Sequence, residues 1–337
     1  LRSTAFALAI TALSGTVLAE TTRQLSDAEW LEDIDAYVGM MREIHLNPFH
    51  TISEADWLAE VDALRADVPQ LTDFAIMLRM RRLAALIGDG HTWLRCGEKY
   101  PPRRLPLRLK EFSDGVFAIG GYGDAAQYRE ATVEAFGGIP TAELVERAPR
   151  YTSSDNEWGR GWYRLECLSD EAFYTELGLL NDDDTVNVTL LRNGAPETVP
   201  LALIPDADYN VWVENESNFI VGDPPLYRLR PDETYWMHWL PEHDTLYVQF
   251  NAVQNREGGP HFVGFGREIM DAVEEHKANK LIVDLRHNGG GNGALLDPTI
   301  RRISENDRIN REGRLFVLTS PKTFSAALMF TVRMERN

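Results

Sequence analysis

The chain has 337 residues, of which 44% are hydrophobic and 26% charged, and this composition is that of an ordinary soluble globular protein with a sizeable core. Its 52 acidic and 34 basic side chains give a formal net charge of −18 at pH 7. A chain this acidic is repelled by nucleic acid and by anionic membrane surfaces, so we set both aside as partners. By itself, the acidic balance indicates solubility.

Residues 1–19 are typical of a secretory signal peptide. Arg2 precedes an apolar run from Ala5 to Leu13, and the small residues needed by signal peptidase follow at Val17-Leu18-Ala19. We expect cleavage after Ala19 and a periplasmic or secreted protein. The apolar run is too short to cross a bilayer, and no later segment reaches the roughly 18 apolar residues of a spanning helix. Because the chain begins with Leu1 rather than Met, we expect it to be a fragment.

Two cysteines, Cys96 and Cys167, are present. In an exported protein they would form one disulfide if the fold brought them together. Their spacing is not that of a structural metal site, and we predict neither a metal nor a cofactor.

An N-terminal helical domain is predicted over residues 20–103. Ser26 and Glu29 form a capping-box pattern ahead of an apolar periodicity of helical spacing. Ser53 is expected to cap a second helix. Thr72 or Asp73 would open a third helix, which stops at Gly88.

Residues 104–205 change to short strands with turns, as at Val116–Ile119 and Ala131–Phe136. Asn193-Gly194 joins two further strands and is a strong hairpin signal. Together these elements resemble a PDZ-type α+β module with an insertion over residues 151–179. Such a module would bind an extended peptide along a sheet edge.

The last predicted domain, residues 206–337, alternates strands and helices, which favours an α/β fold with a parallel sheet and right-handed crossovers. Its expected elements are strands at 245–250, 280–285 and 314–319 and helices at 262–273 and 293–303. The chain ends 12 residues after Ser325, so we expect this domain to be partial and its C-terminus truncated.

Ser325 and Gly289–Gly291 follow the ends of two of these strands, where ligands bind in open α/β sheets. A serine at the start of a helix is most often a plain N-cap. Its alternative role is that of a nucleophile, because the helix N-terminus and the glycine loop leave N–H groups free to hold developing negative charge.

His91 lies in Gly88-Asp89-Gly90-His91-Thr92, where two glycines present it in a tight turn after a helix. It is either a general base or a loop histidine satisfied by local hydrogen bonds. His45 and His50 are interpreted as helix-end and turn residues, since a metal site would need further ligands.

The segments 284–291, 320–327 and 88–92, in their order along the chain, resemble motifs of the S41 serine peptidases, which include the tail-specific or C-terminal processing proteases and their tricorn-like relatives. The resemblance implies an N-terminal helical segment, a PDZ-like middle and a ClpP/crotonase-like α/β core. It also implies that Ser325 is the nucleophile. The backbone amides of Gly291 and Ala326 would form the oxyanion hole, with Gly290 beside them.

His91 stands where the tricorn-like branch carries its histidine base. That branch orients the histidine with a glutamate downstream of the serine, whereas the processing-protease branch uses a downstream lysine as the base. Both positions would fall beyond Asn337, and Lys322 is interpreted as a loop residue.

We therefore predict an exported serine endopeptidase that cleaves extended or unfolded protein segments. The alternative is an inactive S41-fold protein that binds peptides or ligands. Acyl-CoA chemistry on the same type of core is disfavoured by the signal peptide and the PDZ-like segment. The oligomeric state is not predicted.

Overall fold

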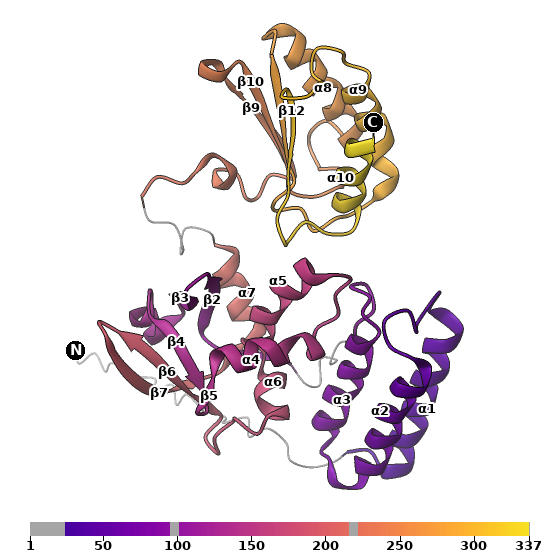
Figure 1. The fold of residues 1–337 in the computed structure, drawn as a ribbon, viewed down its shortest axis with the longest axis vertical. Helices are drawn as coiled ribbons and strands as arrows, with labels where there is room; N and C mark the ends of the chain where they lie inside the picture. The colour runs from indigo at the N-terminus through magenta and orange to yellow at the C-terminus, as the bar shows by residue number, and fades with distance from the viewer. Residues whose placement is uncertain (1–23, 95–100, 216–221, 337) are drawn as a thin grey trace, which may run out of the picture.

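The computed structural model describes residues 24–94, 101–215 and 222–336, and shows a mixed α/β protein with N-terminal helices and several sheets (Figure 1). Buried hydrophobic side chains form three clusters, which lie within residues 30–87, 105–201 and 235–334. The predicted signal peptide and Cys96 lie outside the described residues.

Three helices form the N-terminal part, and their caps are those that the sequence predicts. Ser26 accepts a hydrogen bond from the Glu29 amide while the Glu29 carboxylate accepts one from the Ser26 amide. Ser53 and Thr72 cap the other two helices through their hydroxyl groups. The helices are α1 (Asp27–Ile44), α2 (Glu54–Asp67) and α3 (Asp73–Leu86).

The middle part is an antiparallel sheet in the order β2-β3-β4-β6-β7, with β5 paired to β4. The predicted hairpin is confirmed, because Asn193 and Gly194 connect β6 to β7 at φ values of 50° and 80°. The strands are β2 (Leu107–Phe112), β3 (Gly115–Gly121), β4 (Thr132–Phe136), β5 (Ile139–Pro140), β6 (Thr185–Arg192) and β7 (Ala195–Ala202).

Helices α4 (Thr141–Arg147), α5 (Glu157–Cys167) and α6 (Glu171–Glu176) accompany this sheet, and the last two account for the predicted insertion. A two-stranded pair, β1 (Arg103–Arg104) with β8 (Ile204–Pro205), closes the segment. Helix α7 (Asp206–Glu214) is also attached to it, because Arg104 forms an ion pair of 2.6 Å with Asp206.

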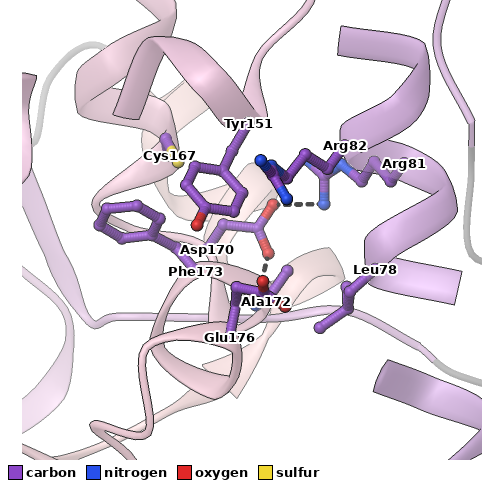
Figure 2. A pocket seen from close by; sticks show the side chains of 9 residues that line it. All are labelled: Leu78, Arg81, Arg82, Tyr151, Cys167, Asp170, Ala172, Phe173 and Glu176. Carbon is purple, nitrogen blue, oxygen red and sulfur yellow. Dashed lines mark hydrogen bonds and ion pairs between the residues drawn. The ribbon is translucent and has the colours of Figure 1, made fainter. Parts of the chain in front are cut away.

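A partly buried ion pair joins the helical part to the middle part (Figure 2). Arg81 of α3 lies 2.8 Å from the carboxylate of Asp170, which is 5% exposed and caps α6. The adjoining cavity of about 20 Å³ has room for little more than one water molecule. Cys167, which also lines it, is buried and forms no disulfide with any residue that the structure describes, and burial raises the pKa of its thiol. This junction is therefore structural.

The C-terminal part contains a four-stranded sheet in the order β12-β11-β10-β9. The predicted parallel pairing of β10 (Thr245–Phe250), β11 (Lys280–Asp284) and β12 (Leu315–Leu318) is confirmed. The sequence analysis missed β9 (Tyr235–Leu240), which pairs with β10 in the antiparallel direction.

Helices α8 (Phe262–Glu275), α9 (Leu296–Ser304) and α10 (Ala326–Arg336) lie on the same side of this sheet (Figure 1). Strands β10, β11 and β12 are neighbours in the sheet in their chain order. When both connections between them are right-handed crossovers, α8 and α9 lie on the same side of the sheet. The two helices approach closely at Gly266, where a Cβ atom would lie 2.4 Å from the hydroxyl of Thr299. No helix in the described part of the chain is both long and apolar enough to cross a membrane.

Candidate active site

The structure brings His91 and Ser325 together although they are 234 residues apart in the chain. Nε2 of His91 lies 3.1 Å from Oγ of Ser325, which is a hydrogen-bonding distance. The histidine follows α3 and the serine precedes α10, so the contact joins the helical and C-terminal parts. In chemical terms, an imidazole nitrogen is placed to accept the proton of a serine hydroxyl.

Ser325 does not have the backbone of an ordinary N-cap. Its φ of +52° lies in the left-handed region, whereas Ser26, Ser53 and Thr72 cap their helices with extended backbones. A left-handed conformation is unfavourable for a residue with a Cβ atom and persists only where neighbouring contacts impose it. The turn directs the hydroxyl toward His91, which favours the chemical role of this serine over the capping role.

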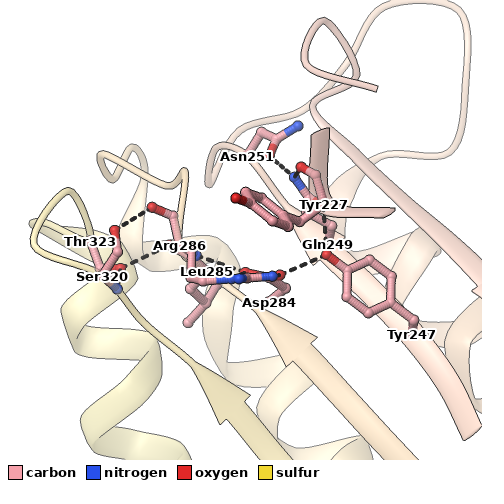
Figure 3. Close-up of polar contacts among 9 residues, drawn as sticks. All are labelled: Tyr227, Tyr247, Gln249, Asn251, Asp284, Leu285, Arg286, Ser320 and Thr323. Atoms are coloured by element: carbon pink, nitrogen blue, oxygen red, sulfur yellow. Dashed lines mark hydrogen bonds and ion pairs between the residues drawn. The ribbon is translucent and has the colours of Figure 1, made fainter. Parts of the chain in front are cut away.

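Three hydrogen bonds hold the segment before Ser325 against the loop that follows β11. The Phe324 amide donates to the Asn288 carbonyl at 3.1 Å. The hydroxyl groups of Thr323 and Ser320 donate to the carbonyls of Leu285 at 2.9 Å and Arg286 at 2.5 Å (Figure 3). Side chains that the sequence analysis left unassigned therefore fix the backbone of the candidate nucleophile.

The same loop is anchored by a polar cluster at the ends of β10 and β11 (Figure 3). Arg286 donates to both carboxylate oxygens of Asp284, which is 1% exposed, and Tyr247 donates to one of them at 2.6 Å. The guanidinium also lies 4.1 Å from the centre of the Tyr227 ring. Burial raises the pKa of Asp284, but the hydrogen bonds from Arg286 and Tyr247 outweigh it, so the pKa is lowered.

Replacing Asp284 with asparagine is expected to lower the free energy of unfolding by about 2 kcal/mol at pH 7, because the change leaves Arg286 without its partner. A lowered carboxyl pKa stabilises the folded state above the pKa of the unfolded chain, near 4, and this stabilisation disappears as the pH falls through the folded pKa. The difference between Asp284→Asn and the parent should therefore shrink below pH 4 in urea unfolding.

Asp297→Asn is the matched control, since Asp297 is 72% exposed and its ion pair with Arg333 is on the surface. Equal unfolding midpoints for Asp284→Asn and the parent at pH 7 would contradict the anchoring role of this cluster.

Gly290 and Gly291 lie where side chains would not fit. A Cβ atom on Gly290 would lie 2.7 Å from the Cβ of Ser325, and one on Gly291 would lie 2.2 Å from the Val253 carbonyl oxygen. Their φ values of +115° and +134° are also conformations that glycine adopts most readily. The glycine loop is therefore packed directly on the serine turn.

The amides near Ser325 differ in their hydrogen bonding. The Gly290 N–H donates to Oδ1 of Asn288 at 2.9 Å. Within residues 24–94, 101–215 and 222–336, the N–H groups of Gly291 and Ala326 have no acceptor. Of the three residues, Gly291 and Ala326 thus retain a free donor.

His91 is supported by Asp89, a residue of the same turn that the sequence analysis did not single out. The Asp89 carboxylate accepts a hydrogen bond of 2.9 Å from the His91 amide, and its Oδ1 lies 3.9 Å from Nδ1 of the ring. Thr92 and His45 bind the other carboxylate oxygen at 2.7 Å and 3.0 Å. Burial raises the pKa of Asp89, but these hydrogen bonds outweigh it and the pKa is lowered.

His45 ends α1, as predicted, but its contact with Asp89 was not foreseen. The Asn47 amide donates to Nδ1 of His45 at 3.1 Å, so neutral His45 carries its proton on Nε2 and donates it to Asp89. The negative charge of Asp89 near Nδ1 of His91 favours a proton on that nitrogen. The lone pair of Nε2 then faces Ser325.

The His91 ring also stacks on Phe324, with ring centres 4.6 Å apart and an interplanar angle of 24°. Gly90 permits this approach, because a Cβ atom there would lie 2.9 Å from the Phe324 ring. The Gly90 amide donates to Asp155 at 2.6 Å, which fixes the turn from the other side. Even so, the His91 side chain is 60% exposed to solvent.

The remaining candidates lie away from this contact. His50 is in a turn and bonds to the Asn47 carbonyl at 3.0 Å. Lys322 is exposed in the loop before Ser325, where its amide bonds to Ser320. Among the described residues, no group of three or more His, Cys, Asp or Glu side chains is arranged to hold a metal ion.

Solved structures show a related fold. The structure of mature CPAF complexed with lactacystin matches with a TM-score of 0.57 and 11% identity, over 80% of this chain and 58% of CPAF. The chain thus spans little more than half the length of that protein, and at this identity the likeness concerns the fold alone.

Two further matches have TM-scores too low to add to the argument. The photosystem II D1 C-terminal processing protease matches at 0.34 with 12% identity, over 93% of this chain and 79% of its own. A putative S41 protease from Bacteroides fragilis matches at 0.25 with 12% identity, over 70% and 61%. No protein-family model and no curated protein sequence matches the chain.

Proposed function

We propose that this chain, which has the S41 peptidase fold, acts as a serine endopeptidase with Ser325 as its nucleophile and His91 as its general base. The observation that carries the proposal is the distance of 3.1 Å between Nε2 of His91 and Oγ of Ser325. A serine hydroxyl is a poor nucleophile at neutral pH, and an adjacent imidazole overcomes this by accepting its proton.

In the proposed reaction, Oγ of Ser325 attacks the carbonyl carbon of a peptide bond as Nε2 of His91 takes the hydroxyl proton. The resulting imidazolium returns that proton to the departing amine, and an acyl group remains on the serine. Water then attacks the acyl group by the same route in reverse, which releases the carboxylate product and restores both side chains.

The negative charge that develops on the carbonyl oxygen needs hydrogen-bond donors. We assign this role to the N–H groups of Gly291 and Ala326, because both lack an acceptor among the described residues, Gly291 follows the Gly290 that packs on Ser325, and Ala326 follows Ser325 itself. Ala326 also begins α10, where the helix dipole favours negative charge. Gly290 holds the loop close to the serine, since its own amide is bound to Asn288.

Asp89 is proposed to position His91, with His45 and Thr92 holding its carboxylate in place. At 3.9 Å from Nδ1 it acts by its charge and by fixing the backbone of the turn, and makes no direct hydrogen bond to the ring.

Extended or unfolded segments of exported proteins are the proposed substrates. The antiparallel sheet of the middle part, interpreted as PDZ-like, has an edge strand that can pair with an extended peptide. Export to the periplasm or outside the cell rests on the signal-peptide pattern of residues 1–19. Neither the proposed chemistry nor the described side chains call for a cofactor.

Labelling with a biotinylated alkyl fluorophosphonate tests this function, because an activated serine displaces fluoride from the reagent and is phosphonylated, whereas ordinary serines stay unmodified. We expect one adduct per chain, located on Ser325 by peptide mass spectrometry. Ser320, five residues earlier, is the internal control and should stay unmodified. A folded protein with no adduct on Ser325 would refute the proposed nucleophile and leave a peptide-binding role.

A further inference from the structure

A second cavity lies beside Ser325, between the N-terminal end of α5 and the loop before α10, and we propose that it binds an arginine or lysine side chain of the substrate. Its volume is about 340 Å³, within the range of small-ligand sites. The proposal rests on the proposed function, since it supplies the side-chain preference of that peptidase.

Phe324 connects this cavity to the reaction site. One side of the Phe324 ring stacks on His91, and the residue also lines the cavity. Leu328, one turn into α10 from Ser325, lines it as well. A substrate held at Ser325 would therefore have a neighbouring side chain within reach of this space.

Asp155 gives the cavity its charge. It is the one ionisable carboxylate among the lining residues, and no arginine or lysine lines the cavity beside it. Its Oδ1 is held at 2.6 Å by the Gly90 amide. Within the part of the chain that the structure describes, no Arg, Lys or His forms an ion pair with Asp155. The carboxylate is thus held in place with its charge unmatched.

Aromatic rings supply the other contacts that a cation favours. Trp158, Tyr163 and Phe324 all line the cavity, and Trp158 is 75% exposed. Burial and the nearby carboxylates of Glu166 and Asp155 raise the pKa of Tyr163, so its ring lies in the field of Asp155. Ring faces attract guanidinium and ammonium groups, and apolar walls accommodate the methylene stems of both side chains.

The overall charge of −18 acts in the same direction, because it draws cationic segments toward the protein. A neutral aromatic or aliphatic side chain would also fit the cavity but would gain nothing from Asp155. The preference therefore depends on one carboxylate, which makes it testable by a single substitution.

The test uses the Ser325→Ala form of the full chain, which binds without turnover. Two acetylated pentapeptide amides, identical except for arginine or its neutral isostere citrulline at the centre, are titrated by ligand-observed NMR. We expect the arginine peptide to bind about fivefold more tightly, as for an exposed ion pair with an aromatic contact. Raising the salt concentration from 0.05 to 1 M should reduce the ratio of the two affinities, because salt screens the charge of Asp155. This measurement needs no further variant.

Asp155→Asn, added to the Ser325→Ala form, keeps an oxygen for the Gly90 amide and removes the charge, so the ratio should fall to about one. Glu157→Gln is the matched control. It removes a charge two residues away that is 85% exposed, paired with Arg160 and outside the cavity, and it should leave the ratio unchanged.

Equal affinities in the Ser325→Ala form, a ratio that survives Asp155→Asn, or no binding of either peptide would overturn the proposal. These outcomes are independent of the labelling of Ser325. If Ser325 is not labelled but the preference for the arginine peptide remains, the peptidase function is refuted and the binding cavity is not.

Discussion

Replacing Ser325 with alanine is expected to lower the rate of peptide hydrolysis by at least about 10⁴-fold, because it removes the hydroxyl that lies 3.1 Å from Nε2 of His91 and that we propose forms the acyl intermediate. The nucleophile and its base act as a unit, so losing one removes nearly all the benefit of the other. Hydrolysis of a fluorescein-labelled unfolded protein, such as reduced casein, measures the effect in the full-length protein.

Ser304→Ala is the control for this change, since Ser304 ends α9 in the same part of the molecule and lies outside the site. Its hydrolysis rate should equal that of the parent. If Ser325→Ala has the parent's circular dichroism spectrum and hydrolyses the substrate within tenfold of the parent rate, a different residue is the nucleophile.

Replacing His91 with glutamine is expected to lower hydrolysis by about 10³-fold. Glutamine has a comparable reach and can still hydrogen-bond to Ser325, but it cannot accept the hydroxyl proton at neutral pH. The second-order rate of fluorophosphonate labelling at Ser325 should fall in parallel, which separates loss of activation from loss of substrate binding.

His50→Gln is matched to this variant in chemistry and in its place in the helical part of the chain. Among the described residues, His50 forms a hydrogen bond with the local Asn47 carbonyl alone, and its replacement should change neither rate. Labelling of His91→Gln at the parent rate would show that Ser325 is activated by another group, such as a lysine.

Much of the local structure was predictable because its causes are local. The capping box of α1, the hydroxyl caps of α2 and α3 and the Asn193-Gly194 hairpin are set by side chains and backbone angles within a few residues. The parallel strands β10 and β11 were equally visible, as short apolar runs separated by a helical periodicity.

Strand β9 was missed because its residues carry no clear alternation. Its sequence, Tyr-Trp-Met-His-Trp-Leu over residues 235–240, is apolar almost throughout, so periodicity alone does not distinguish it. Only its pairing with β10, a contact made in the folded sheet, identifies it as a strand.

The candidate site was likewise predictable in part: its residues could be identified from the sequence, but their contacts could not. The sequence identified its residues by their type and position, namely a serine before a helix, a histidine after a glycine turn and a glycine loop after a strand. The sequence did not predict how these residues contact one another. The 3.1 Å contact of His91 with Ser325 and the left-handed turn at Ser325 depend on packing between distant segments.

By itself, the sequence determined the helix caps, the hairpin, the α/β alternation and the pool of candidate residues, because short-range sterics and hydrogen bonds act between neighbours in the chain. Tertiary structure alone brought three carboxylates to partners that are distant in the chain. Asp89 meets His45, Asp284 accepts a hydrogen bond from Tyr247, and Asp155 accepts one from the Gly90 amide and lines a cavity. The function of a carboxylate cannot be assigned from sequence alone, because its interactions depend on the charges, hydrogen-bond donors and burial that folding places around it.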